Sequence, residues 1–459
     1  MDSTVSPPHS STLPQFSDRL LFWALASFMI VLPLKAVGSH RFPLPLDMLC
    51  LAMMILPVFA CLWAQKPPLK ELLIPSAVFM LALAAMVSEA ATAWSFRTGL
   101  RFISYFIFVL SISLLAPEER RNRLLRISLL GGSVVLAFSL IGYFVATLAM
   151  QRGDGPVPFI FTSSHPVFPN IPRLTGTMGT HPQNWGEYCV LLLSLAFYAN
   201  GRLDDRHRRL TIISAGLASI SLVFTFSQAW VGGLWIAAWF VQSRNSTRRW
   251  MKPIILSVTI LTTLAITWVV NIGFPSKPGT DGQRRAVPCD QADAGHFVAR
   301  AEYLDGTHLC HFTWHEWPYH HRLTTYLQAK STAIEAIRLH PWFGTGQAGY
   351  RVFADDHFAA TLGQGTTSGT NYTHPHSTWL GIPAQFGVLA TISWLWLVIL
   401  LFVRRPKPGQ PERVLLVTVA VFLVLGLDWS IEQSIIFWTL IGWVAPPFSS
   451  ARSGVTDDR

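Results

Sequence analysis

The chain has 459 residues, of which 51% are hydrophobic and 13% are charged, and its formal net charge is +10. Soluble domains carry about 25% charged residues, so this composition excludes an ordinary soluble globular protein and predicts a polytopic membrane protein. The positive charge does not indicate a nucleic-acid partner, because the Lys and Arg residues cluster in short runs between apolar segments, as membrane topology requires.

About twelve apolar segments follow one another, each near the ~20 residues that cross ~30 Å of hydrocarbon. They span residues 20–38, 45–64, 72–91, 98–116, 126–149, 183–200, 209–226, 228–243, 253–272, 378–403, 412–427 and 431–446. We therefore predict an all-α polytopic fold of about twelve transmembrane helices, with tails at 1–19 and 447–459.

Five of the links between these segments are short and rich in Lys and Arg, for example "PEERRNRLLR" and "GRLDDRHRR". Cytoplasmic loops carry such an excess, so these links and both chain termini are expected to face the cytoplasm. The five links are residues 64–71, 117–126, 201–209, 242–252 and 403–413. Alternation then places two long loops, 150–182 and 273–377, in the periplasm.

The large loop between segments nine and ten contains a predicted helix that lies over the membrane surface. In "TTYLQAKSTAIEAIRLHPWFG", Leu327, Ala333, Ile334, Ala336 and Ile337 are at helical spacing, and His-Pro marks the end. The following "GTGQAGYRVF" predicts a glycine turn and a second short helix. The polar stretch 275–320 has no periodicity that assigns it.

The five cysteines fall into two groups. Cys50, Cys61 and Cys189 lie in apolar segments and are interpreted as small core residues. Cys289 and Cys310 both lie in the large loop, where an oxidising periplasm favours a disulfide between them. Two free thiols remain the alternative.

Several arginines on the predicted outer face run against the positive-inside bias. They are Arg97 and Arg101 in "SFRTGLRFISY", Arg173 in "NIPRLTG", Arg322 in "YHHRLTT" and Arg351 in "GQAGYRVF". A guanidinium group pairs with phosphate through two parallel hydrogen bonds, so such arginines could hold a diphosphate whose lipid tail lies in the bilayer. Alternatively, each arginine pairs with a local acid or a lipid headgroup.

Two histidines, His374 and His376, stand at the start of the tenth segment in "THPHSTWL". A neutral histidine can take a proton from a sugar hydroxyl at physiological pH, and nearby arginines disfavour the imidazolium form. His376 is therefore a candidate general base. The alternative is an interfacial histidine satisfied by water or a backbone carbonyl.

No metal or cofactor is predicted. The large loop is rich in histidine and acid, but it contains no HExxH motif and no paired CxxC motif. The chain also lacks a GxSxG elbow and a P-loop, so the hydrolase and NTPase classes have no support.

Three stretches in the second half of the chain resemble the O-antigen ligase and polymerase superfamily. They are "RLTGTMGTHPQNWGEYCVLLLSLAF", "HRLTTYLQAKSTAIEAIRLHPWFGTGQAGYRVF" and "HPHSTWLGIPAQFGVLA". They are similar to the family's Arg-x-x-Gly…Pro-Asn stretch, its Arg-helix-His-Pro-x-x-Gly-x-Gly loop and its His-Asn-x-x-Leu…Gly stretch. The first half of the chain matches only in hydropathy.

The resemblance implies an enzyme of the Gram-negative inner membrane whose site faces the periplasm. Arg173 and Arg322 would bind the pyrophosphate of an undecaprenyl-diphosphate-linked glycan, and His376 would activate the acceptor hydroxyl, with His374 in support. The implied reaction transfers O-antigen to a lipid A–core acceptor and is metal-independent and inverting. It needs no cofactor and no nucleic acid, and its partners are membrane lipids.

The chain departs from the family at three positions, one of which is "PQN" at 182–184, where Pro-Asn is usual. Gln228 in "FSQAW" stands where the family often has arginine, and His376 is followed by Ser377 and not by Asn. Arg351 or Arg97 could take over the missing phosphate contact.

Other functions remain open. A repeat-unit polymerase of the same superfamily would use a second lipid-linked glycan as acceptor, and a protein-glycosylating ligase would use a protein. A secondary transporter is a different class, and such carriers often have two repeated halves with midplane sites. No repeat is visible here, and Asp47, Glu89 and Glu187 lie near predicted segment ends, where charge costs least.

Overall fold

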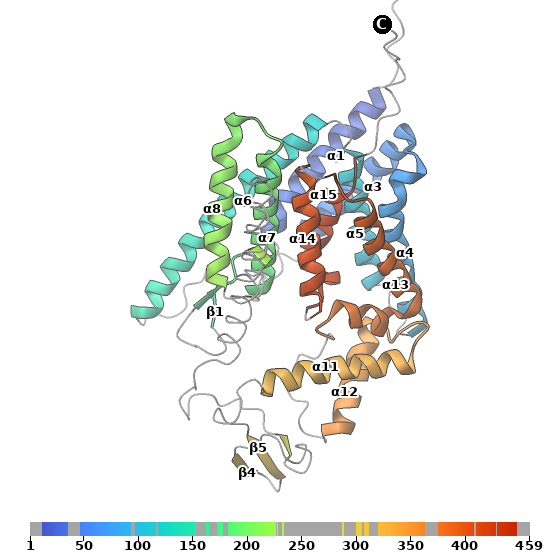
Figure 1. Ribbon diagram of the computed structural model, residues 1–459, viewed down its shortest axis with the longest axis vertical. Helices are drawn as coiled ribbons and strands as arrows, with labels where there is room; N and C mark the ends of the chain where they lie inside the picture. Colours follow the sequence, from blue (N-terminus) through green and yellow to red (C-terminus); the bar gives the residue numbers. More distant parts are fainter. Residues whose placement is uncertain are drawn as a thin grey trace, which may run out of the picture.

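The structure is a computed structural model. It describes residues 12–34, 46–92, 97–115, 118–152, 162–164, 172–177, 182–225, 227, 232–233, 287–288, 300–304, 307–311, 320–362, 375–407, 410–427 and 429–447. Most of these residues are helical, and the long helices stand side by side in a bundle (Figure 1).

The bundle contains α1 (Thr12–Val31) with η1 (Leu32–Leu34), α3 (Leu46–Gln65), α4 (Leu69–Thr92), α5 (Arg97–Leu114), α6 (Glu118–Arg152), α7 (Pro182–Asn200), η2 (Asp205–His207) with α8 (Arg208–Thr225), α13 (Thr378–Val403), α14 (Glu412–Leu425), and η3 (Ile431–Gln433) with α15 (Ile435–Val444). Two further helices, α11 (His320–Leu339) and α12 (Gln347–Leu362), lie across one end of it (Figure 1).

Two small antiparallel sheets lie outside the bundle. One pairs β1 (Thr162–Ser164) with β2 (Pro172–Leu174). The other has the strand order β3-β5-β4 and consists of β3 (Val287–Pro288), β4 (Arg300–Leu304) and β5 (Thr307–His311), within the stretch that the sequence left unassigned. Cys310 lies in β5 opposite Val287. Cys289 lies outside the described residues, so the disulfide stays a prediction.

The described helices coincide with ten of the predicted apolar segments, while 228–243 and 253–272 are outside the described part apart from Gly232 and Gly233. Three helix starts differ clearly from the predicted ones. The helix α1 begins at Thr12 and not at residue 20, within the predicted tail 1–19. The helix α6 begins at Glu118 and not at residue 126, because "EERRNRLLR" consists mostly of strong helix formers with two acids in the first turn. The last helix begins at Ile435, after the turn η3.

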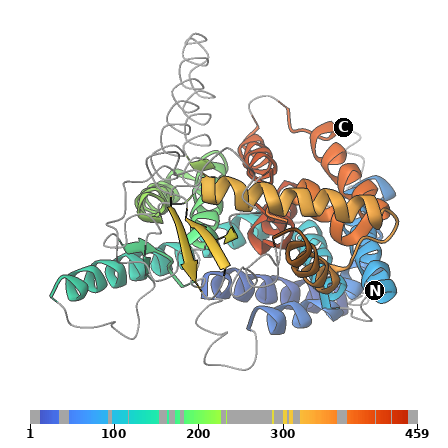
Figure 2. The same ribbon diagram turned by 90° about the horizontal axis from the view of Figure 1, so that it is seen from below.

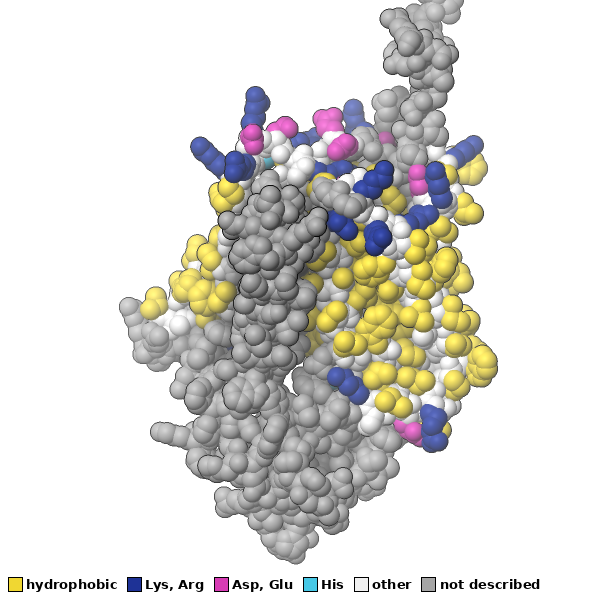
Figure 3. All heavy atoms as spheres, in the orientation of Figure 1, with side chains coloured by type: hydrophobic (Ala, Val, Ile, Leu, Met, Phe, Trp, Pro, Cys, Tyr) yellow, Lys and Arg dark blue, Asp and Glu magenta, His cyan; other side chains and the backbone are white. Residues whose placement is uncertain are grey.

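Within the described residues, five helices are long and apolar enough to cross a membrane: Phe16–Leu34, Leu69–Thr92, Glu118–Leu148, Asp205–Thr225 and Thr378–Val403. The outer surfaces of the bundle helices carry exposed apolar side chains, such as Leu56 and Trp63 on α3 and Ile141 on α6. Figure 3 shows a broad apolar band below a rim of Lys, Arg, Asp and Glu. This surface is typical of a helical membrane protein.

Three of the predicted basic loops meet at the end of the bundle that is uppermost in Figure 1. Arg202, after α7, lies 3.5 Å from Glu118 at the start of α6 and 2.9 Å from Glu412 at the start of α14, measured from Nη2 to Oε1. These ion pairs bring loops 117–126, 201–209 and 403–413 together. The basic loop 242–252 lies outside the structure's described ranges. We call this end the basic end.

The core between α5, α13 and α15 is aromatic. The ring of Trp438 stacks on Tyr105 with centroids 5.4 Å apart and meets the edges of Phe102 and Trp394 at 5.9 and 6.3 Å. Trp438 is fully buried. Aromatic pairs in these arrangements contribute beyond their buried area, and they fix how the three helices face one another.

The helix α13 is broken at Gly387, whose φ of 72° and ψ of −166° are not helical. The loop that follows α11 inserts at the break. Val388 N donates to Pro341 O at 2.9 Å, and Ala384 O accepts from Thr345 N at 3.0 Å. Irregular backbone at membrane depth is tolerated where protein covers it, and here the loop replaces the missing helical hydrogen bonds.

Glycines make this insertion possible. A Cβ on Gly387 would lie 2.2 Å from Trp342 O, and a Cβ on Gly344 would lie 2.4 Å from Gln385 C. Gly346 N donates to Gln385 O at 2.7 Å, and the Ser88 hydroxyl of α4 donates to the same oxygen at 3.0 Å. The predicted glycine turn is thus clamped between α4 and α13.

The helix predicted in the large loop is confirmed as α11, and it packs on α12 and α13 through small side chains. Ala329, Ala333 and Ala336 are buried on one face, whereas Ile334 is 56% exposed. Burial raises the pKa of Tyr350, so its hydroxyl stays protonated and donates to Ala329 O at 3.2 Å. The end of the bundle that α11 crosses is opposite the basic end (Figure 1), and we call it the distal end.

Candidate functional site

His376 lies at the distal end, two residues before α13. Its φ of 49° is in the left-handed region, which few residues other than glycine adopt. The side chain is half-buried, and its ring centroid lies 6.2 Å from that of Trp429. A strained backbone at a polar segment motivates a functional interpretation.

The residues after His376 are fixed to the link between α14 and η3. Thr378 N donates to Gly426 O at 2.8 Å and to Trp429 O at 3.1 Å. The Thr378 hydroxyl lies 2.6 Å from Glu432 Oε2, and Ile431 N donates to Thr378 Oγ1 at 2.8 Å. These bonds set the start of α13 and therefore hold the backbone of His376 in place.

Glu187 connects this segment to α7. It is 2% exposed, accepts a hydrogen bond from the Ser434 hydroxyl, and contacts the side chains of Gln183 and Trp429. Trp429 thus lies between Glu187 and the ring of His376. Sequence reasoning did not assign Glu187 or Glu432 to the site. The available signal was an acid within an apolar segment, because such a charge is costly unless it has partners.

Arg173 lies in β2, opposite Ser163 of β1. Its Nε donates to Thr225 O, the last residue of α8, at 3.1 Å, which fixes the guanidinium plane at that helix end. The Thr225 and Ser227 hydroxyls are 2.8 Å apart. Arg173 thus lies at the end of α8, beside which stands Ser227 of "FSQAW", and Gln228 lies outside the described residues.

The Arg173 segment also packs on the start of α7. Gly176 has a φ of 56°, and a Cβ there would lie 2.1 Å from the indole of Trp185. Trp185 is buried two residues before Glu187. The first turns of α7 therefore connect the Arg173 segment to the His376 segment.

Arg322 belongs to the first turn of α11, but its side chain lies outside the described part, as does that of Arg97 at the start of α5. His374 is outside the described residues altogether. Arg351 is exposed on α12, and Arg101 is half-buried on α5. The Arg173 segment thus contacts the start of α7 directly, at Trp185, whereas the His376 segment reaches it through Trp429 and Glu187. The helix of Arg322 lies across the same end.

The helices of Arg351 and Arg101 touch through other side chains. The Thr98 hydroxyl of α5 bonds to the Gln347 side chain of α12. Gln347 and Arg351 are one helical turn apart on α12, and Thr98 and Arg101 are one turn apart on α5. Arg351 and Arg101 thus each lie one helical turn from the contact between Thr98 and Gln347.

Among the side chains that the structure describes, no three His, Cys, Asp or Glu residues gather in a way that could hold a metal ion. The side chains of the histidines between 296 and 321 are outside that set.

No protein-family model matches the chain, and no curated protein matches it.

Proposed function

We propose that the protein is a glycosyltransferase of the Gram-negative inner membrane that joins a glycan from undecaprenyl diphosphate to a lipid A–core acceptor. Arg173 and Arg322 bind the diphosphate, and His376 is the general base. The observation that carries the proposal is that the first turns of α7 connect the Arg173 and His376 segments at the distal end, across which the helix of Arg322 lies.

The proposal includes a topology of about twelve spans with both termini in the cytoplasm. The basic end then faces the cytoplasm and the distal end faces the periplasm. Support comes from the ion pairs of Arg202, which unite three basic loops at one end. Both substrates are tethered to the membrane, so a site at the outer interface can meet both.

The chemistry follows from the residue types. The bond between the sugar C1 and the diphosphate oxygen breaks, and its electron pair leaves with the diphosphate, whose charge the arginines stabilise. The acceptor oxygen bonds to C1 from the opposite face, and its proton passes to the neutral His376 ring. Attack opposite the leaving group inverts the anomeric centre. The hydrogen bonds of Thr378 fix the backbone from which the His376 ring projects.

Two of the buried acids have structural partners, which disfavours transport. Glu89 Oε2 accepts from Thr98 N at 2.8 Å and Gly99 N at 3.2 Å, and so caps α5. Glu432 binds Thr378 at the start of α13. Proton-coupled carriers place acids where they can exchange protons with a pathway, whereas these acids hold helix ends.

Purified protein tests the proposal directly. We expect that it extends lipid A–core with glycan from an undecaprenyl-diphosphate-linked donor, and that a chelator leaves the rate unchanged. Extension of a second donor molecule instead would assign the chain to repeat-unit polymerases. Failure to extend either acceptor with an active donor preparation would contradict the transferase proposal.

A further inference from the structure

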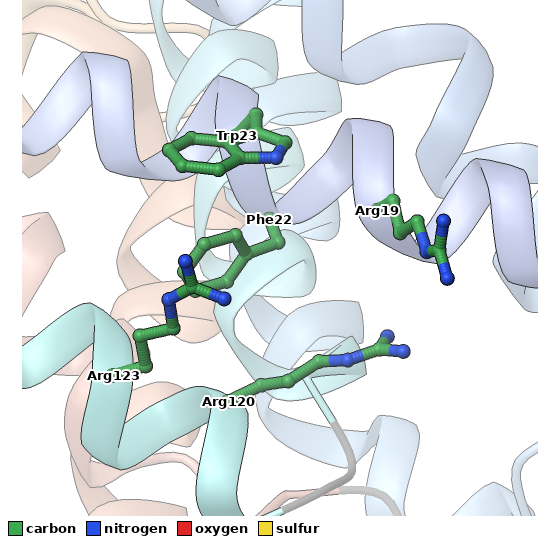
Figure 4. A pocket seen from close by; sticks show the side chains of 5 residues that line it. All are labelled: Arg19, Phe22, Trp23, Arg120 and Arg123. Carbon is green, nitrogen blue, oxygen red and sulfur yellow. The ribbon is translucent and has the colours of Figure 1, made fainter.

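A pocket of about 370 Å³ opens at the basic end between α1 and α6, far from the distal site along the bundle. Its lining consists of three arginines and two aromatic residues, Arg19, Phe22, Trp23, Arg120 and Arg123 (Figure 4). Nothing in the proposed reaction uses this pocket.

The pocket has excess positive charge. Arg120 pairs with Asp18, with Nη1 and Oδ2 3.0 Å apart. Within the described part of the chain, neither Arg19 nor Arg123 pairs with an acid, and both are exposed. Two of the three guanidinium charges thus have no acidic partner among the described residues, which favours an anionic ligand.

The aromatic residues orient one of the arginines. The guanidinium carbon of Arg123 lies 5.3 Å from the ring centre of Phe22 and 5.5 Å from that of Trp23. Such stacking holds the planar guanidinium group and leaves its N–H edges for a ligand. Trp23 is 54% exposed, so its indole forms part of the outer surface.

Exposed apolar side chains continue from the pocket along both helices. On α6, Leu130, Val134 and Ile141 are 58%, 61% and 64% exposed, and they follow Arg123 at helical spacing. On α1, Ile30 is 43% exposed, seven residues after Trp23. The two helices pack closely, with a Cβ on Gly131 expected 3.4 Å from Ile30 Cγ1. The charged pocket therefore lies at one end of an exposed apolar surface that continues along α1 and α6.

We propose that this pocket binds the phosphate of an anionic phospholipid in the leaflet at the basic end, with the acyl chains along α1 and α6. Arginines bind phosphate through paired hydrogen bonds, and basic pockets between transmembrane helices are suited to anionic headgroups. A free phosphate ion would gain nothing from the exposed Trp23 and the apolar surface beyond it. This proposal does not depend on the transferase function.

Native mass spectrometry of the full chain in detergent, with equal amounts of phosphatidylglycerol and phosphatidylcholine, tests the site. We expect the wild type to retain phosphatidylglycerol preferentially. In the double variant Arg19→Gln/Arg123→Gln, the preference for phosphatidylglycerol should fall about five-fold for each arginine removed, or roughly twenty-five-fold in total. The control is Arg208→Gln/Arg209→Gln, an exposed pair at the start of α8 that does not line the pocket.

Equal losses in both double variants would show that the preference belongs to the whole basic end and would overturn the site. Displacement of phosphatidylglycerol by millimolar inorganic phosphate would assign the pocket to the free ion. The wild type provides a check that needs no variant. Raising the salt from 0.1 to 1 M shortens the Debye length from about 10 to about 3 Å, so the preference should fall steeply, and an unchanged preference would contradict the proposal.

Discussion

The His376→Ala variant is expected to transfer no detectable glycan while it still inserts in the membrane. A positioned general base contributes about 10²- to 10⁴-fold to a rate, and alanine removes the only group that we assign to the acceptor proton. The fold should persist, because the backbone and hydroxyl hydrogen bonds of Thr378 anchor the start of α13. Silver-stained lipopolysaccharide from a ligase-null strain expressing the variant should lack the O-antigen ladder.

Arg322→Ala should give the same result, because the leaving diphosphate loses a stabilising charge. The matched control is Arg338→Ala on the same helix. Arg338 is exposed, and it pairs with Glu335 one turn away at 2.6 Å, an ion pair of little energetic value. A ladder is expected with Arg338→Ala. A ladder with His376→Ala or Arg322→Ala would count against the assigned roles.

Gly387→Ala is expected to lower the free energy of unfolding by about 2–4 kcal/mol. The rate of glycan transfer should fall as well. The φ of 72° with ψ of −166° belongs to a region that is essentially restricted to glycine, and the new Cβ would lie 2.2 Å from Trp342 O. The inserted loop would have to leave α13, and α11 would lose its position across the distal end. Heating detergent-solubilised protein and following its monodisperse size-exclusion peak measures the effect.

The control for this variant is Gly142→Ala in α6, where nothing lies within 4 Å of a new Cβ. Alanine is the better helix former by about 1 kcal/mol, so this variant should be as stable as the wild type or slightly more stable. If the Gly387→Ala and Gly142→Ala proteins had the same melting temperature, the break in α13 would not require glycine. The insertion of the loop at that break would then be misassigned.

The helices were predictable because a membrane span leaves a strong signal, a long apolar run bounded by charge. The break in α13 was not. The run "TWLGIPAQFGVLATISWLWLVILLFV" is continuous in hydropathy, and glycine is common in transmembrane helices. What breaks the helix is a loop about forty residues earlier in the chain, whose "FGTG" turn supplies replacement donors. Such a long-range exchange cannot be read from local periodicity.

Candidate site residues could be proposed from the sequence where a residue type implied its chemistry. A histidine at the start of a span and an arginine on the outer face are costly in apolar surroundings, and this cost makes His376 and Arg173 candidates for a polar site. Glu187 was interpreted as lying at a segment end where charge is inexpensive. The structure buries it instead, because η3 and the Trp429 link cover that end of α7.

The most direct test of the central claim is retention of undecaprenyl diphosphate by purified wild type and variants, measured by native mass spectrometry. If arginines at the distal end hold the diphosphate and His376 acts only on the acceptor, Arg173→Gln and Arg322→Gln should each lose binding about ten-fold or more, and His376→Ala should retain it. Undiminished binding in both arginine variants would contradict the account.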